Sequence, residues 1–167
     1  MAKQLIRKYL KLLKSKTRWP CLGKTLKKGA LYLFDCDLDG KTNPNDGKKH
    51  KKHFFIILSH ELYNRKMNSY LGVGLSSNTD QSYAMKLPME QFSNWSGAIN
   101  SGKYRAFEGA TQLTYLADKV CRLKEDDLLF TDDKLSLPLL TVTGKAYEQI
   151  IKHISNFMKI PNDDPNV

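Results

Sequence analysis

The sequence predicts a small, mostly β domain, in which several short strands form a barrel or a curled sheet and a helix packs on it. Apolar runs of strand length alternate with turn-forming residues through the middle of the chain. A stripe of apolar residues at helical spacing follows near the end. The length of 167 residues and the apolar content of 41% are those of one globular domain with a core of ordinary size.

Three apolar runs in the first half predict three strands. Residues 31–34 form a near-continuous apolar run, and residues 54–58 and 70–75 follow as the second and third strands. Two glycines inside the third run mark a bulge or a close approach by another backbone or a ligand. Residues 37–47 are rich in Asp, Asn, Gly and Pro and predict a loop, whereas 64–68 predict a polar turn.

The second half is less regular. Residues 83–87 predict a strand that Pro88 closes, and residues 111–123 carry two strand-like patterns in succession. Residues 91–109 hold four aromatic side chains among Ser, Asn and Gly, with cations close by. This segment is either a loop that its aromatics fix to the core or a surface on which bases stack. The apolar stripe near the end predicts an amphipathic C-terminal helix with Thr143 as its N-cap.

Positive charge is concentrated in the first third of the chain. The net charge is +10, yet residues 1–53 hold 15 Lys or Arg against 4 Asp, and the remainder is close to neutral. This asymmetry favours a polyanionic partner, such as nucleic acid, an acidic protein segment or an anionic membrane. We predict three parts: an extension over 1–28 that begins with a basic amphipathic helix over 3–16, a domain over 29–160 and a tail over 161–167.

Several classes of protein are disfavoured. No apolar run approaches the roughly 18 residues of a membrane span, and lysines interrupt the N-terminal apolar pattern. We therefore expect a soluble, cytoplasmic protein without a membrane partner; the alternative is that the N-terminal helix lies on a membrane surface. Three cysteines without a CxxC arrangement indicate neither disulfides nor zinc, and Cys36 is predicted to be a small buried residue. No metal-ligand cluster or nucleotide-binding motif is present, so no metal or cofactor is expected.

Phosphodiester cleavage without a metal is the chemistry that these residues favour. It needs a base for the 2′-hydroxyl, an acid for the leaving 5′-oxygen and donors for the charge on phosphorus. His53 is the candidate acid or base because an imidazole titrates near neutral pH, and Ser76 or Ser77 is the candidate hydroxyl donor. Neighbouring strand ends are expected to bring these groups together. The candidate RNA-binding residues are six basic side chains and one aromatic: Lys49, His50, Lys51, Lys52, Trp95, Lys103 and Arg105.

The order of these segments resembles the MazF/PemK/Kid family of toxin endoribonucleases over roughly residues 28–158. Residues 28–35 are similar to the family's opening, a basic residue and a glycine before an apolar strand that ends in Asp. Residues 71–77 resemble the strand that ends in a catalytic Thr or Ser, and residues 115–120 the late segment that contains Asp. The resemblance implies an SH3-like barrel that forms a homodimer, cleaves single-stranded RNA without a metal and is inhibited by an antitoxin protein.

The resemblance also assigns roles by position. The family's catalytic Thr or Ser falls on Ser76, with Ser77 beside it, and its catalytic Arg falls on His53. The imidazole of His53 thus replaces an arginine guanidinium, which is a forked and permanently charged donor, and Phe54 replaces the usual Pro. The two lysines directly before His53 are then expected to bind phosphate. Two hypotheses remain: an endoribonuclease toxin with His53 as acid or base, or a barrel of the same fold that has lost catalysis and only binds nucleic acid or a protein partner.

Overall fold

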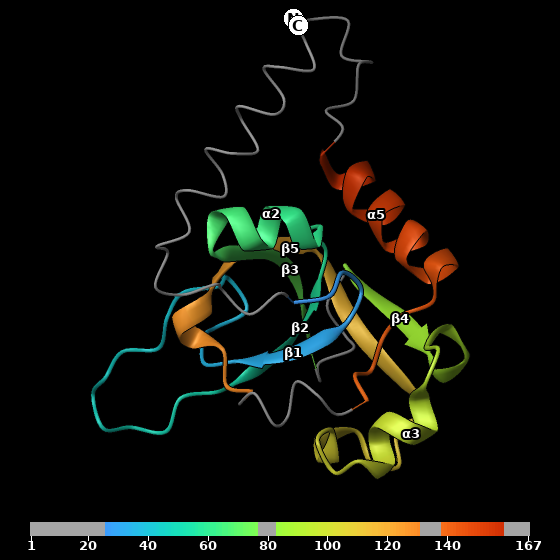
Figure 1. Cartoon of the computed structure of the whole chain (residues 1–167), viewed down its shortest axis with the longest axis horizontal. Helices are drawn as coiled ribbons and strands as arrows, with labels where there is room; N and C mark the ends of the chain where they lie inside the picture. The colour runs from blue at the N-terminus through green and yellow to red at the C-terminus, as the bar shows by residue number, and fades with distance from the viewer. Residues whose placement is uncertain (1–25, 77–82, 131–137, 159–167) are drawn as a thin grey trace, which may run out of the picture.

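The computed structural model describes residues 26–76, 83–130 and 138–158. The predicted N-terminal helix, Ser77 and the C-terminal tail lie outside these described residues. Five strands form one antiparallel sheet of order β1-β2-β3-β5-β4, which curls into a half-barrel (Figure 1). In chain order the elements are β1 (Leu31–Phe34), β2 (His53–Ile57), α2 (Glu61–Met67), β3 (Ser69–Leu75), β4 (Ala84–Pro88), η1 (Met89–Gln91), α3 (Trp95–Asn100), η2 (Arg105–Phe107), β5 (Gln112–Lys124), η3 (Glu125–Asp127) and α5 (Gly144–Met158).

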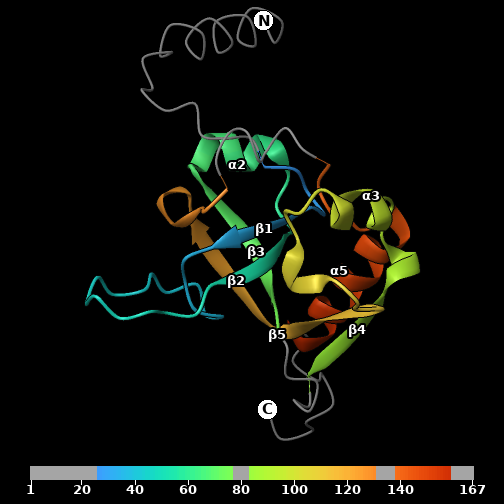
Figure 2. The ribbon, with the colours of Figure 1, turned by 90° about the horizontal axis from the view of Figure 1, so that it is seen from below.

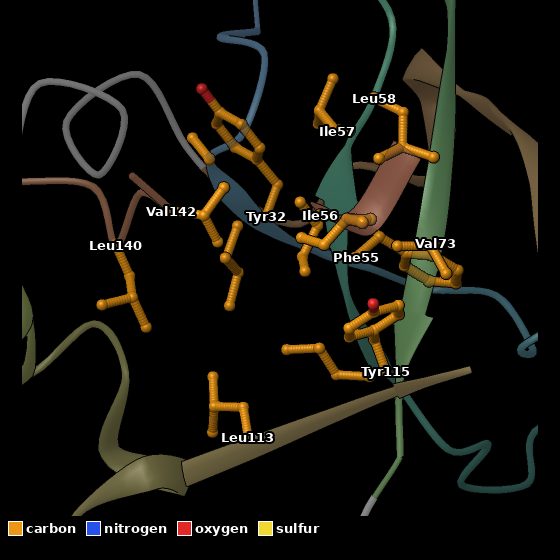
Figure 3. Close-up of a cluster of buried hydrophobic side chains, with 14 of the residues drawn as sticks. Tyr32, Phe55, Ile56, Ile57, Leu58, Val73, Leu113, Tyr115, Leu140 and Val142 are labelled. Atoms are coloured by element: carbon orange, nitrogen blue, oxygen red, sulfur yellow. The ribbon is translucent and has the colours of Figure 1, made fainter. Parts of the chain in front are cut away.

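The core fills the inside of the curled sheet. The predicted strands of the first half are confirmed as β1, β2 and β3, and their apolar side chains are almost fully buried, among them Tyr32, Phe55 and Val73. Tyr115 of β5 joins them, and Figure 3 shows these side chains gathered between the four strands. Each large apolar side chain buried in this way contributes roughly 1.5–3 kcal/mol. Cys36 is also fully buried, as predicted.

β5 is one continuous strand, so the prediction of two successive strand patterns over 111–123 is wrong. Its first part pairs with β4 over 112–116, and its longer part pairs with β3 up to Lys124. The register between β3 and β5 shifts beside Gly74, between Val73 and Leu75. The two sequence patterns therefore reflect two pairing partners along one strand rather than two strands. The shift also confirms that a glycine in β3 marks a bulge.

α2 replaces the polar turn that the sequence predicts over 64–68. The imidazole Nδ1 of His60 accepts a hydrogen bond from the backbone N–H of Leu62 at 3.1 Å and caps the first turn. Asn68, with φ of 50°, ends the helix in the left-handed conformation that asparagine tolerates. Seven residues are too few to give a recognisable helical period in the sequence.

Asn64 links α2 to the chain before β1. Its side chain is buried, and its amide nitrogen donates to the carbonyl oxygens of Leu26 and Ser59 at 3.1 and 3.2 Å. Leu26 itself is 1% exposed and belongs to the core. The packed body thus includes a residue of the extension that the sequence analysis predicts over 1–28.

Residues 91–109 form two short helical segments, α3 and η2, and the end of η1. Tyr104 is fully buried; its hydroxyl donates to the carbonyl oxygen of Leu31 at 2.9 Å and accepts from the backbone N–H of Leu140 at 3.0 Å. Phe92 is also buried. Of the two predictions for this segment, these residues support the one in which aromatic side chains fix it to the core.

α5 is the predicted C-terminal helix, and it lies beside β4 and β5 (Figure 1). Thr143 is its N-cap as predicted, because its Oγ1 accepts from the backbone N–H of Ala146 at 3.2 Å. Ala146, Ile150 and Ile154 recur at helical spacing and are buried. In the described part of the chain, no helix is long and apolar enough to cross a membrane.

Candidate active site

His53 is the first residue of β2, and its imidazole has a fixed orientation. Nδ1 lies 2.9 Å from the carbonyl oxygen of Cys36. A carbonyl oxygen can only accept, so Nδ1 carries the hydrogen and donates it. Nε2 is then the nitrogen that can take a proton from, or give one to, a ligand. The side chain is half-buried, which keeps part of the ring accessible.

Ser76 lies close to His53 at the end of the β2–β3 pair, because both residues line the same cavity. The pairing of β2 with β3 ends at Phe55 and Gly74, two residues from His53 on one strand and from Ser76 on the other. The backbone N–H of Ser76 donates to the carbonyl oxygen of Thr114 at 2.9 Å, which fixes the residue just beyond the end of β3. Antiparallel pairing thus places the start of β2, the end of β3 and the start of β5 side by side.

A cavity of about 350 Å³ opens at these three strand ends. Four of the predicted site residues line it together: Lys51, Lys52, His53 and Ser76. Both lysines are exposed, so their ammonium groups are available to a phosphate at the mouth. The arrangement combines an oriented proton donor or acceptor, two cations and a hydroxyl within one concave site. Metal-independent phosphodiester cleavage uses groups of these kinds, with two proton transfers of which one imidazole can serve one.

Most of the other residues that line the cavity are apolar or aromatic, and the sequence analysis did not predict them as site residues. Phe54 and Phe107 contribute rings whose centroids are 4.8 Å apart, and Leu38 packs against the sheet where Gly74 has no Cβ. Gln112 adds an exposed amide at the mouth. Phe107 belongs to the aromatic segment 91–109, so composition gave a signal for the segment but not for which of its rings reaches the site.

Two predicted residues lie in the loop between β1 and β2 rather than in the cavity. This loop projects from the body of the molecule (Figure 2). Nε2 of His50 lies 2.6 Å from Oδ1 of Asp46, and this hydrogen bond holds the pKa of Asp46 below its ordinary value. Lys49 is exposed on the same loop. Neither His50 nor Lys49 lines the cavity with His53, although both belong to the basic stretch that leads into it.

The three predicted residues of segment 91–109 are placed differently from one another. Trp95 is half-buried in α3, with its ring centroid 5.1 Å from that of Phe92, and does not line the cavity. The ammonium group of Lys103 is buried 4.7 Å from the centroid of the Phe130 ring, so its charge is not at the surface. Arg105 is exposed and directly precedes residues that line the cavity.

The alternating aspartates after β1 hold the loop rather than forming a cluster. Asp35 accepts a hydrogen bond from the side chain of Asn43 at 2.7 Å, and Asp37 accepts from the backbone N–H of Asp39 and of Lys41. Among the residues that the structure describes, no group of three or more His, Cys, Asp or Glu side chains is arranged to hold a metal ion. These aspartates therefore stabilise the turn by accepting hydrogen bonds within the loop, as Asp side chains commonly do in turns.

Comparison with known proteins establishes the fold. No protein-family model matches the sequence, and no curated protein matches it. Among solved structures, MazF from Deinococcus radiodurans is similar at 12% identity, over 82% of this chain and 99% of that chain, with a TM-score of 0.50. A MazE-MazF structure from the same organism is similar at 12% identity, over 81% and 97% of the two chains, with a TM-score of 0.52. The chain therefore has a MazF-like fold, as the resemblance in sequence implied.

Proposed function

We propose that this protein is a MazF-like endoribonuclease toxin that cleaves single-stranded RNA without a metal. The observation that carries the proposal is the cavity at the strand ends, in which the oriented imidazole of His53, two exposed lysines and Ser76 meet. The MazF-like fold around this cavity supports the same activity. The excess of positive charge over residues 1–53 fits a polyanionic substrate.

In this reaction the 2′-hydroxyl of the RNA attacks the adjacent phosphorus, and the bond to the 5′-oxygen breaks. Nε2 of His53 either takes the proton from the attacking 2′-hydroxyl or gives a proton to the leaving 5′-oxygen. Attack and departure occur on opposite sides of phosphorus, so water or another group handles the second proton. Lys51 and Lys52 bind the phosphate and offset the growing negative charge, while Ser76 donates a hydrogen bond that positions the scissile group.

The proposal includes a cellular setting. A toxin of this type acts in the cytoplasm, works as a homodimer and is inhibited by an antitoxin protein. One of the similar solved structures holds MazE together with MazF, which supports a protein partner for this chain. An acidic or extended segment of such a partner would compete with RNA for the same basic surface.

The second hypothesis is a barrel of this fold that binds RNA or a protein partner without cutting. One observation favours it: His53 stands where the resemblance implies an arginine. An imidazole lacks the forked pair of donors and the permanent charge with which a guanidinium holds a phosphate. Transition-state stabilisation would then rest on the two lysines alone, each a compact point charge on a flexible stem.

Purified wild-type protein incubated with a mixed-sequence single-stranded RNA in EDTA separates the two hypotheses. We expect discrete cuts that leave 2′,3′-cyclic phosphate and 5′-hydroxyl ends, because the 2′-hydroxyl is the nucleophile. The same RNA with 2′-O-methyl riboses is the matched control and should stay intact. Tight, salt-sensitive binding without cuts would reject the nuclease and support the binding-only barrel.

A further inference from the structure

The proposed catalytic groups make up only part of the cavity lining, and the remaining lining has a different chemistry. We propose that this remaining part holds a single RNA base next to the scissile phosphate, with Phe107 as its stacking surface and Gln112 as the residue that reads its edge. The inference rests on the proposed function and deepens it, because it assigns the base preference of the proposed enzyme to η2 and the start of β5.

Phe107 has the surroundings of a stacking residue. It is half-buried, so its ring is held in place yet partly open to the cavity. Behind it, the ring of Tyr104 lies nearly parallel, at 17°, with a centroid distance of 6.2 Å, and Phe54 packs at 4.8 Å. Because Tyr104 is fully buried and hydrogen-bonded to β1, this aromatic wall is rigid. A preorganised ring loses little entropy when a base stacks on it.

The polar groups of the cavity are suited to the edge of a base. Gln112 and Thr114 lie at the start of β5, and both line the cavity together with Leu113 between them. The Gln112 amide offers donors and an acceptor at once, the combination that pairs with the Watson–Crick or Hoogsteen edge of an exposed base. Its exposure at the mouth lets it reach a base that has left the stack.

Charge and shape select a nucleotide over an apolar peptide. Lys51 and Lys52 flank the cavity, so a base inside it would have its own phosphate beside two cations and His53. A volume of about 350 Å³ accommodates one planar base with its sugar rather than a helix or a strand. Single-stranded RNA is recognised in this way, through unstacked bases placed on aromatic side chains and neutralised phosphates.

Binding of uncleavable RNA tests the inference. Wild-type protein is titrated with four 2′-O-methyl homopolymers of A, C, G and U, which lack the attacking hydroxyl. We expect one of the four to bind at least about 10-fold more tightly than the weakest, as one stacked and hydrogen-bonded base allows. Gln112→Ala should bring the four affinities to within about 3-fold of one another, with an unchanged salt dependence. Phe107→Leu should weaken the preferred homopolymer by about 10-fold, whereas Phe107→Tyr should retain it.

Matched variants outside the cavity control for these changes. Gln149→Ala removes an exposed glutamine from α5, and Phe157→Leu removes an exposed ring, and both should leave the preference intact. A preference that persists in Gln112→Ala and Phe107→Leu overturns the inference, as do equal affinities for all four homopolymers in the wild type. Cleavage is measured separately with unmodified RNA. If the two variants cut this RNA with an unchanged base preference, the base pocket is refuted and the nuclease proposal stands. If the wild type binds with the expected preference but never cuts unmodified RNA, the nuclease proposal is refuted and the base pocket stands.

Discussion

At the scale of single residues, the hydrogen bond between His53 and the Cys36 carbonyl determines what the imidazole can do. It assigns the hydrogen to Nδ1 and leaves Nε2 to exchange a proton with a ligand. An arginine at this position would hold a phosphate but could not act as a base, because it stays protonated. In the proposed reaction, phosphate binding therefore falls to the neighbouring lysines, and position 53 is assigned proton transfer instead.

Burial also acts on side chains that do not line the cavity. It raises the pKa of the thiols of Cys36 and Cys121, and of the phenols of Tyr32 and Tyr115, to about 12 in each case. The unfolded chain ionises these groups near their ordinary values of about 9 and 10. Above pH 9 the unfolded state thus binds fewer protons than the folded one, and the free energy of unfolding falls as pH rises. The slope that each such group contributes rises toward a limit of about 1.4 kcal/mol per pH unit between its unfolded and folded pKa values, so the thiols act at lower pH than the phenols.

Urea unfolding followed by circular dichroism at pH 7.5, 8.5, 9.5 and 10.5 measures this effect. The midpoint should be constant up to about pH 8.5 and should then decrease steadily. Cys36→Ala removes one of the buried thiols, so this variant should show a shallower decrease between pH 8.5 and 10 than the wild type. A midpoint that rises, or stays level to pH 10.5, would contradict the raised pKa values.

At the scale of elements, the turn after β1 fixes the loop that carries the basic residues to the sheet. Gly40 has φ of 76°, and a Cβ at this position would lie 3.0 Å from the carbonyl oxygen of Arg122 and 3.0 Å from Cβ of Cys121. Gly47 in the same loop has φ of 73° but nothing within 4 Å of such a Cβ. The two glycines therefore share the backbone requirement, and only Gly40 approaches β5 closely.

Alanine substitutions at these two glycines distinguish the cost of the left-handed backbone from the cost of close contact with β5. Gly47→Ala should lower the free energy of unfolding by about 1 kcal/mol, the cost of a left-handed residue with a Cβ. Gly40→Ala should lower it by roughly 1–3 kcal/mol more, since the new atom would lie 3.0 Å from a carbonyl oxygen and a Cβ of β5, closer than ordinary van der Waals contact. Urea denaturation of the two variants gives both values. Equal losses in the two would show that the turn does not pack on β5 as described.

At the scale of the whole molecule, the sheet brings together parts of the chain that the sequence keeps far apart. The lysines before β2 and the serine after β3 meet because antiparallel strands place one strand's start beside its neighbour's end. The projecting loop in Figure 2 extends the basic surface away from this cavity. If the chain binds RNA as proposed, RNA attracted by the exposed lysines of the loop arrives near the cavity.

Local patterns predicted the strands and α5 because apolar periodicity is set by residues close in sequence. The same reasoning predicted that Cys36 is buried and that a glycine of β3 sits at a bulge. It missed α2, a short helix whose ends depend on two capping residues. It also predicted two successive patterns where β5 is one strand, because β5 pairs with β4 along its first part and with β3 along the rest. The aromatic wall could not be derived, since Phe107 reaches the cavity only through the packing of Tyr104 on β1.

Cleavage of single-stranded RNA by His53→Ala tests the central claim most directly. The rate in EDTA should fall by at least about 100-fold relative to the wild type, as expected for the loss of a general acid or base, while RNA affinity stays within about 3-fold. His60→Asn is the matched control, because it removes an exposed imidazole outside the cavity and keeps a helix-capping side chain. Undiminished cleavage in His53→Ala, or an equal loss in His60→Asn, would contradict the assignment of proton transfer to His53.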